Sequence, residues 1–305
     1  DQHGTAIIAA AGLINALHLT GREMKDIKVV SNGAGAASIA CVELIKAMGV
    51  KHENVILCDR SGVIYQGREE GMNQWKSAHA VKTEARNLVD ALKGADVFLG
   101  LSAAKAVTPE MLKSMADKPI VFAMANPEPE IMPDIAKKAR PDAIIATGRS
   151  DFPNQVNNVL GFPYIFRGAL DVRASAINEE MKIAAANAIA MLAREDVPDE
   201  VNHAYSGEQL RYGTEYIIPA PFDPRLISAV SSAVAEAAMD TGVARKPIED
   251  IEAYKRDLSA RLDPTASFLQ DVFARITPEQ KRVVFTEGEE EVSIRGAIAF
   301  RNAGY

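Results

Sequence analysis

The stretch from residue 27 to residue 59 constrains the fold more than any other part of the chain. Residues 27–31 form a short, mostly apolar and β-branched run, as expected of a buried parallel strand. A glycine turn follows, then a helical pattern that ends at Gly49, and then an apolar run, residues 55–58, that leads directly to Asp59. Strand, glycine turn, helix, strand and terminal acid together predict a dinucleotide-binding βαβ unit.

The glycine turn reads G-x-G-x-x-S, with Ser38 where the dinucleotide fingerprint has its third glycine. Gly33 permits the tight turn, Gly35 lets the backbone approach a pyrophosphate, and the helix N-terminus offers free N–H groups and a positive dipole end. Asp59 is spaced to accept hydrogen bonds from a ribose. The candidate cofactor-binding residues of the turn are Asn32, Gly33, Gly35, Ala36, Ala37 and Ser38.

The residues after Asp59 bear on the choice between NAD and NADP. A carboxylate repels a 2′-phosphate, so Asp59 alone would favour NAD. Arg60 and Ser61 follow directly, and a guanidinium beside a hydroxyl suits a phosphate. Arg68 and Lys76 in the next loop could add positive charge. We therefore expect NADP, with NAD as the alternative, and we expect the polar stretch 60–82 to line the rim of the site.

Strands and helices continue to alternate after the βαβ unit. We expect helices over 84–92, with Thr83 as N-cap, and from Thr108-Pro109 onward. Further strands are predicted at residues 96–99, 119–124 and 143–146. This alternation is typical of an α/β fold with a Rossmann-type, doubly wound parallel sheet, whose ligands bind beyond the carboxyl ends of the strands.

The composition changes towards the C-terminus. Long helices are expected at 179–193 and 225–239, and charged helical patterns follow at 248–262 and 266–276. A strand at 282–285 and a helix at 292–302 then read as the first strand–helix unit of a further α/β domain. We therefore predict a cofactor-binding domain over 1–246, a helical linker over 247–281, and the start of another domain over 282–305.

Bulk properties exclude several classes of protein. The 305 residues are 48% apolar and 25% charged, as in an ordinary globular protein, and the net charge of −7 argues against a nucleic-acid partner. The apolar run 6–19 contains Asn15 and His18 and is shorter than the roughly 20 residues of a membrane span, so we expect a packed helix and no membrane partner. Cys41 and Cys58 lack metal-ligand spacing, and we expect reduced thiols in a cytoplasmic protein.

Four separated motifs along residues 1–245 resemble those of the malic enzyme family, in particular its large bacterial form with a phosphate-acetyltransferase-like domain. Residues 1–6, D-Q-H-G-T-A, are similar to the family's D-D-x-Q-G-T-A motif entered at its second aspartate, with His3 as an extra difference. Residues 31–38 match the family's cofactor turn, and 125–127 and 155–168 match its two substrate-and-nicotinamide loops. The resemblance implies oxidative decarboxylation of malate to pyruvate and CO₂ with reduction of NADP.

The resemblance also implies roles for single residues. Asp1 would be one of three carboxylate ligands of a Mg²⁺ or Mn²⁺ ion that stabilises the enolate left when CO₂ departs. The other two ligands and the acid–base pair, a tyrosine and a lysine, are expected before residue 1, so no catalytic acid or base is assigned within the chain. Asn126 and Asn158 would bind the substrate, and Asn126 and Asn157 the cofactor. We therefore expect residues 1–305 alone to bind cofactor without oxidising malate.

Other interpretations of these residues stay open. Taken alone, Asp1 would be an acid at a helix N-terminus, Asn126 a turn former before proline, and Asn157-Asn158 a helix cap. The chain could also belong to another Rossmann dehydrogenase, acting on an amino acid or a folate, or be a non-catalytic nucleotide-binding module. Malate- and metal-dependent reduction of the cofactor separates these alternatives.

Residues 285–295 resemble the opening of phosphate acetyltransferases. In a two-part malic enzyme this implies that the added domain assembles subunits into a homo-oligomer and senses acetyl-CoA as an effector. The helical linker would then connect the effector domain to the cofactor domain.

Overall fold

The structure is a computed structural model that describes residues 2–205, 209–261, 283–284 and 286–302. It divides into two compact units, Asp1–Glu249 and Asp250–Tyr305. The predicted boundary between linker and second domain, at 281/282, lies outside the described residues and stays a prediction.

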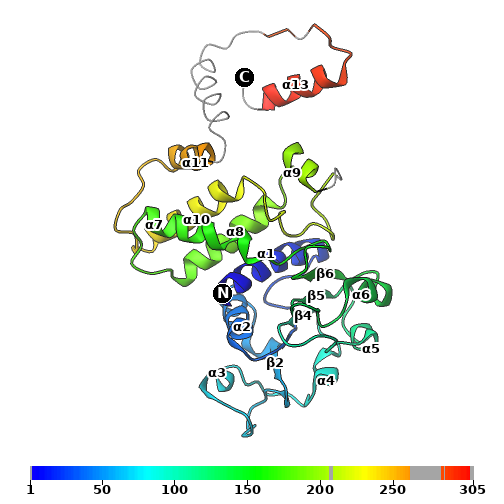
Figure 1. Ribbon diagram of the computed structural model, residues 1–305. Coiled ribbons are helices and arrows are strands. Elements are labelled where there is room, and N and C mark those ends of the chain that lie inside the picture. The colour runs from blue at the N-terminus through cyan, green and yellow to red at the C-terminus, as the bar shows by residue number, and fades with distance from the viewer. Residues whose placement is uncertain (1, 206–208, 262–282, 285, 303–305) are drawn as a thin grey trace. The chain divides into compact units, whose positions relative to one another are not determined.

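The first unit is built on one six-stranded sheet with the order β3-β2-β1-β4-β5-β6 (Figure 1). All neighbouring strands are parallel except β3, which forms an antiparallel hairpin with β2. The doubly wound sheet expected from the sequence is confirmed, and β3 is an addition that the sequence did not predict. The strands are β1 Val29–Asn32, β2 Val55–Asp59, β3 Gly62–Val63, β4 Val97–Gly100, β5 Ile120–Ala123 and β6 Ile144–Thr147.

Helices cover both faces of the sheet (Figure 1). On one face, α4 (Leu88–Leu92), α5 (Pro109–Lys113) and α6 (Pro133–Ala139) share a core with side chains of all six strands, among them Phe98 and Val121. The other face is covered by α1 (Gln2–Thr20) and α2 (Ala36–Ala47). Beyond α1 lies a helical layer of α7 (Phe162–Asp171), α8 (Glu179–Leu192) and α10 (Leu226–Asp240). The shorter helices of this unit are α3 Gln74–Ser77, α9 Asp199–Ala204, η1 His52–Asn54 and η2 Asn158–Leu160.

Helix α1 is the packed helix that the sequence predicted. Among the described residues it alone has the length and hydropathy of a membrane-spanning helix, and 67% of its apolar window is buried inside the protein. Asn15, in its middle, is fully buried. Its Nδ2 donates to the carbonyl oxygens of Ala190 (2.8 Å) and Ile217 (2.9 Å), and its Oδ1 accepts from Arg194 Nε at 2.7 Å. These bonds offset the cost of burying an amide and tie α1 to the outer helical layer.

Two helix starts differ from the prediction, and each has a capping residue as its cause. Thr83 is not the N-cap of α4. Its Oγ1 accepts only a local hydrogen bond from Ala85 N, and the helix begins at Leu88 with Asn87 accepting from Asp90 N. In the second unit, α11 (Ile251–Ala260) begins later than predicted, because Asp250 accepts from Ala253 N at 2.9 Å and caps it there. The predicted cap at Thr108 is confirmed.

The second unit contains α11 and α13 (Glu291–Asn302). The helix predicted at 266–276 lies outside the described residues. The strand predicted at 282–285 is wrong for its two described residues, because Val283 and Val284 belong to no strand and are 54% and 81% exposed. An apolar run needs a neighbouring strand to satisfy its backbone groups, and none of the described residues of this unit forms one.

Candidate dinucleotide site

A cavity of about 540 Å³ lies beyond the carboxyl ends of β1, β2 and β4. Ligands of open parallel sheets bind at this edge, where the strand order reverses. In this sheet β2 lies on one side of β1 and β4 lies on the other, so the strand order reverses at β1. The cavity is lined by Asn32, Gly33, Ala34, Gly35, Asp59, Arg60, Ser61, Gly71, Lys76, Leu101, Ser102, Ala103 and Ala106.

Gly33 allows the loops after β1 and β4 to touch. Its φ is +117°, and a Cβ placed on it would lie 2.3 Å from the carbonyl oxygen of Leu101. Hydrogen bonds from Gly33 N to the Cys58 carbonyl (2.9 Å) and from Leu101 N to the Asn32 carbonyl (2.8 Å) fix three strand ends together. A residue with a side chain could not occupy this position without moving the loop after β4.

Gly35 is the N-cap of α2 and faces open space. A Cβ added there would meet nothing within 4 Å, and no side chain caps the helix in the described part of the chain. The first N–H groups of α2 are therefore available to a phosphate, as the sequence predicted for this type of turn. Ala36 and Ala37 form the first turn of α2.

The buried hydroxyl of Ser38 stabilises the turn through hydrogen bonds. Ser38 is 1% exposed, and its Oγ lies 2.8 Å from Ser31 Oγ and 2.5 Å from the Gly33 carbonyl oxygen. The hydroxyl thus closes the turn on itself and does not line the cavity. Asn32 is 8% exposed, and its Nδ2 donates to Ser102 Oγ at 2.7 Å. Sequence reasoning missed Ser102, because it follows β4 and no motif marks it.

Asp59 is the last residue of β2, and its carboxylate accepts hydrogen bonds from nearby residues of the chain. Arg68 Nη2 lies 2.8 Å from both oxygens, Lys76 Nζ lies 2.7 Å from Oδ2, and Ser61 N lies 2.9 Å from Oδ1. Burial raises the pKa of Asp59, but the hydrogen bonds from Lys76 and Arg68 outweigh it and hold the pKa below its ordinary value. The carboxylate is therefore ionised and paired with two cations.

The charge at this end of the cavity is positive. Asp59 contributes −1, and Arg60, Arg68 and Lys76 contribute +1 each, which gives +2. Arg60 is exposed, whereas the side chains of Arg68 and Lys76 are 5% and 17% exposed. Of these four residues Arg60, Lys76 and Asp59 line the cavity, so an anionic group there would meet two cations beside one carboxylate.

The second predicted group of site residues follows β5 and β6, at the same edge of the sheet. Asn126 is exposed in the loop after β5 and precedes a cis proline, Pro127. Asn157 caps η2, since its Oδ1 accepts from Val159 N at 3.1 Å. Asn158 Oδ1 accepts from Thr5 Oγ1 at 3.2 Å, so the first turn of α1 is joined to η2. Two motifs that are far apart in the sequence therefore meet in space at Thr5 and Asn158.

A metal site cannot be built from the described residues. No three His, Cys, Asp or Glu side chains among them gather closely enough to hold a metal ion. Asp1, the predicted ligand, lies outside the described residues. The metal therefore rests on the resemblance of residues 1–6 to the family motif.

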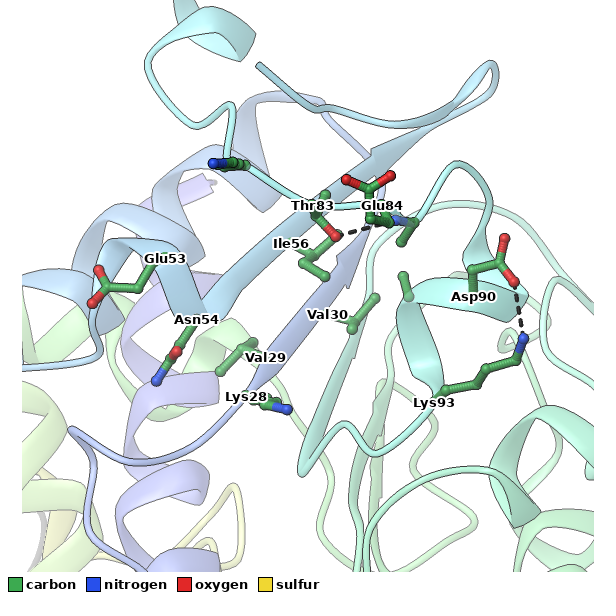
Figure 2. Close-up of a pocket in the computed structure, with 13 residues that line it drawn as sticks. Lys28, Val29, Val30, Glu53, Asn54, Ile56, Thr83, Glu84, Asp90 and Lys93 are labelled. Carbon is green, nitrogen blue, oxygen red and sulfur yellow. Dashed lines mark hydrogen bonds and ion pairs between the residues drawn. The ribbon is translucent and has the colours of Figure 1, made fainter.

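A second hollow, of about 560 Å³, lies at the opposite edge of the sheet (Figure 2). It is bordered by the start of β1, by Glu53 and Asn54 before β2, and by Asp90 of α4 and the following Lys93, which form an ion pair at 3.0 Å. Among the described residues that line it there is no glycine turn and no N-terminus of a long helix, the features that bind a pyrophosphate.

Comparison with known proteins agrees with the geometry of the site. Residues 2–205 match the family described as "Malic enzyme, NAD binding domain". The chain is 67% identical over 302 residues to the NADP-dependent malic enzyme of Rhizobium meliloti and 52% identical over 305 residues to the NAD-dependent malic enzyme of the same organism. The two matches include 99% and 100% of this chain, respectively. The chain spans only 40% of the length of each relative.

Solved structures give the same family. The crystal structure of malic enzyme from Pyrococcus horikoshii is 38% identical, with a TM-score of 0.75 over 90% of this chain and 61% of that one. Sequence, fold and the arrangement of the dinucleotide cavity therefore agree, and the chain belongs to the malic enzyme family.

Proposed function

We propose that the protein containing this chain oxidises malate to pyruvate and CO₂ and reduces NADP, with Mg²⁺ or Mn²⁺ as a required metal. Membership of the family and the activity named for its relatives support the reaction. Within this reaction the chain contributes the dinucleotide site. NADP, when bound, accepts the hydride from the alcohol carbon of malate.

Different residues of the chain bind different parts of NADP. The N-terminus of α2 with Gly35 binds the pyrophosphate, and the loops after β4 and β5 receive the nicotinamide half. Arg60, Ser61 and Lys76 bind the 2′-phosphate. The observation that carries the preference for NADP is the pairing of Asp59 with Arg68 and Lys76, because it turns a repelling carboxylate into part of a positive cluster.

The metal and the acid–base pair belong to the proposal through the family resemblance. Asp1 would supply one metal ligand, and Asn126 and Asn158 would contact the substrate. We propose that residues 1–305 alone bind NADP but do not oxidise malate, because the remaining ligands and the acid–base pair are expected before residue 1.

The direct test uses a full-length protein carrying this chain, incubated with malate and NADP, with and without Mg²⁺. We expect NADPH and pyruvate to form in equal amounts and the reaction to stop when the metal is chelated. NADPH formation without pyruvate would indicate a different Rossmann dehydrogenase, and binding of NADP without turnover would indicate a nucleotide-binding module.

The C-terminal unit is proposed to assemble subunits into a homo-oligomer and to carry the response to acetyl-CoA. The resemblance of residues 285–295 to phosphate acetyltransferases supports this role. If it is correct, acetyl-CoA alters malate oxidation by the full-length protein but not by a version truncated near Pro247. We also propose a cytoplasmic location, which is supported by the two buried free thiols, Cys41 and Cys58.

A further inference from the structure

Glu130 is a fully buried acid that no motif of the sequence marked as functional. An ionised carboxylate without hydrogen bonds would be very costly at such a position. Glu130 Oε1 accepts from Ser102 N at 2.8 Å and from Ser102 Oγ at 3.2 Å, and Oε2 accepts from Ala125 N at 3.0 Å. The two oxygens thus bind the backbone of two different loops.

These two loops are the ones that follow β4 and β5. Ser102 lines the dinucleotide cavity, and its Oγ accepts from Asn32 Nδ2, which belongs to the end of β1. Ala125 directly precedes Asn126, the predicted ligand of the substrate and nicotinamide. One buried carboxylate therefore connects the ends of β1, β4 and β5 at the edge where the cavity opens.

The end of β4 leaves room for this carboxylate. A Cβ added to Gly100 would lie 2.5 Å from Glu130 Cδ and 2.6 and 2.8 Å from its two oxygens. The absence of a side chain at Gly100 allows the acid to reach beneath both loops. Its hydrogen bonds to main-chain N–H groups are charge-assisted, and such bonds are roughly twice as strong as neutral ones.

We propose that Glu130 is a positioning residue for the nicotinamide half of the cofactor and for the substrate. It holds the loop at Ser102 and the loop at Ala125-Asn126 in one fixed relation, whereas the adenosine half depends on α2 and the cluster around Asp59. The part of this inference that concerns malate rests on the proposed function. The comparison of nucleotide affinities that tests the rest does not require the protein to oxidise malate.

The test is Glu130→Gln in a full-length protein carrying this chain. A glutamine keeps the shape but has one acceptor oxygen, so either Ser102 N or Ala125 N loses its acceptor. We expect the Kd of NADP and the KM of malate to rise by about 10- to 150-fold, the range for losing a hydrogen bond to a charged group. The Kd of adenosine 2′,5′-bisphosphate, which reaches only the adenosine half, should change less than twofold.

A matched control is Asp223→Asn. Asp223 is also fully buried and accepts from Arg225 N (2.9 Å) and Arg225 Nε (3.0 Å), but it does not line the cavity. This variant should lower the Tm and leave both affinities unchanged. Ser102→Ala offers a milder second variant, because it removes no buried charge, and it should weaken NADP binding by about 3- to 10-fold without affecting the bisphosphate.

Equal weakening of NADP and the bisphosphate by Glu130→Gln, or no effect on either, would overturn the positioning role. If the unmodified protein does not oxidise malate, the proposed function fails, but the comparison of the two affinities still decides the role of Glu130.

Discussion

Lys76 gives the sharpest test of cofactor choice. Its ammonium has three N–H donors, and two of them are directed to Asp59 Oδ2 and to the Gly71 carbonyl, each at 2.7 Å. No described residue accepts from the third, which we assign to the 2′-phosphate. Lys76→Met keeps the length of the side chain but removes this donor and lowers the cluster charge from +2 to +1. A hydrogen bond to a charged group contributes about 1.5–3 kcal/mol, and about 1.4 kcal/mol corresponds to tenfold.

We therefore expect Lys76→Met to weaken NADP binding by roughly 10- to 150-fold and NAD binding by less than about threefold, because NAD has no 2′-phosphate. Isothermal titration of both nucleotides against the full-length protein measures this. Lys93→Met is the matched control, since Lys93 is exposed, pairs with Asp90 and lies at the opposite edge of the sheet (Figure 2). Equal losses for NADP and NAD, or a loss in the control, would refute the assignment.

Four further predictions concern the same unit. Arg60→Ala should weaken NADP binding about tenfold more than NAD binding, which titration of the two nucleotides would show; equal losses count against a phosphate contact. Gly33→Ala should destabilise the fold by about 2–4 kcal/mol in urea unfolding, owing to its positive φ and the contact with the loop after β4. Gly35→Ala, by contrast, should keep its Tm and lose NADP affinity, and a fall in Tm would contradict this. Burial, with the nearby charges of Lys46 and His52, lowers the pKa of His79 from 6.5 to about 4. The folded state therefore favours the neutral ring, and the stability that is present above pH 6.5 is lost as the pH falls towards 4. Between pH 7 and pH 5 the free energy of unfolding should fall by about 2 kcal/mol more in the unmodified protein than in His79→Gln, and parallel curves would exclude His79 as the cause.

The βαβ unit could be predicted from the sequence because each of its parts is local. The apolar run before Asn32, the two glycines and the terminal acid all lie within residues 27–59, and each has its own physical signature. The N-cap at Thr108 was predictable for the same reason, since threonine is followed directly by proline. Thr83 and Asn87 show the limit of this approach. Both are good capping residues, and only the packing of the following helix decides which one is used.

The contacts that shape the site are mostly not local. The pairing of Asp59 with Arg68 and Lys76 depends on how the loop after β3 folds back. Glu130 looks in the sequence like one acid in a proline-rich turn, and its burial follows from the missing side chain at Gly100 on another strand. Ser38 looks like a weak substitute for glycine until its hydrogen bonds to Ser31 and Gly33 are seen.

We propose that the cavity at the carboxyl edge of the sheet is the NADP site. Hydrogen–deuterium exchange of the full-length protein, with and without NADP, tests it most directly. We expect protection of the glycine turn, the Asp59 cluster and the loop after β4, and no change around the hollow of Figure 2. The segments expected to be protected are 33–38, 59–61, 71–76 and 101–103. Protection of residues 82–85 and 90–93 instead, or of neither edge at saturating NADP, would contradict the account.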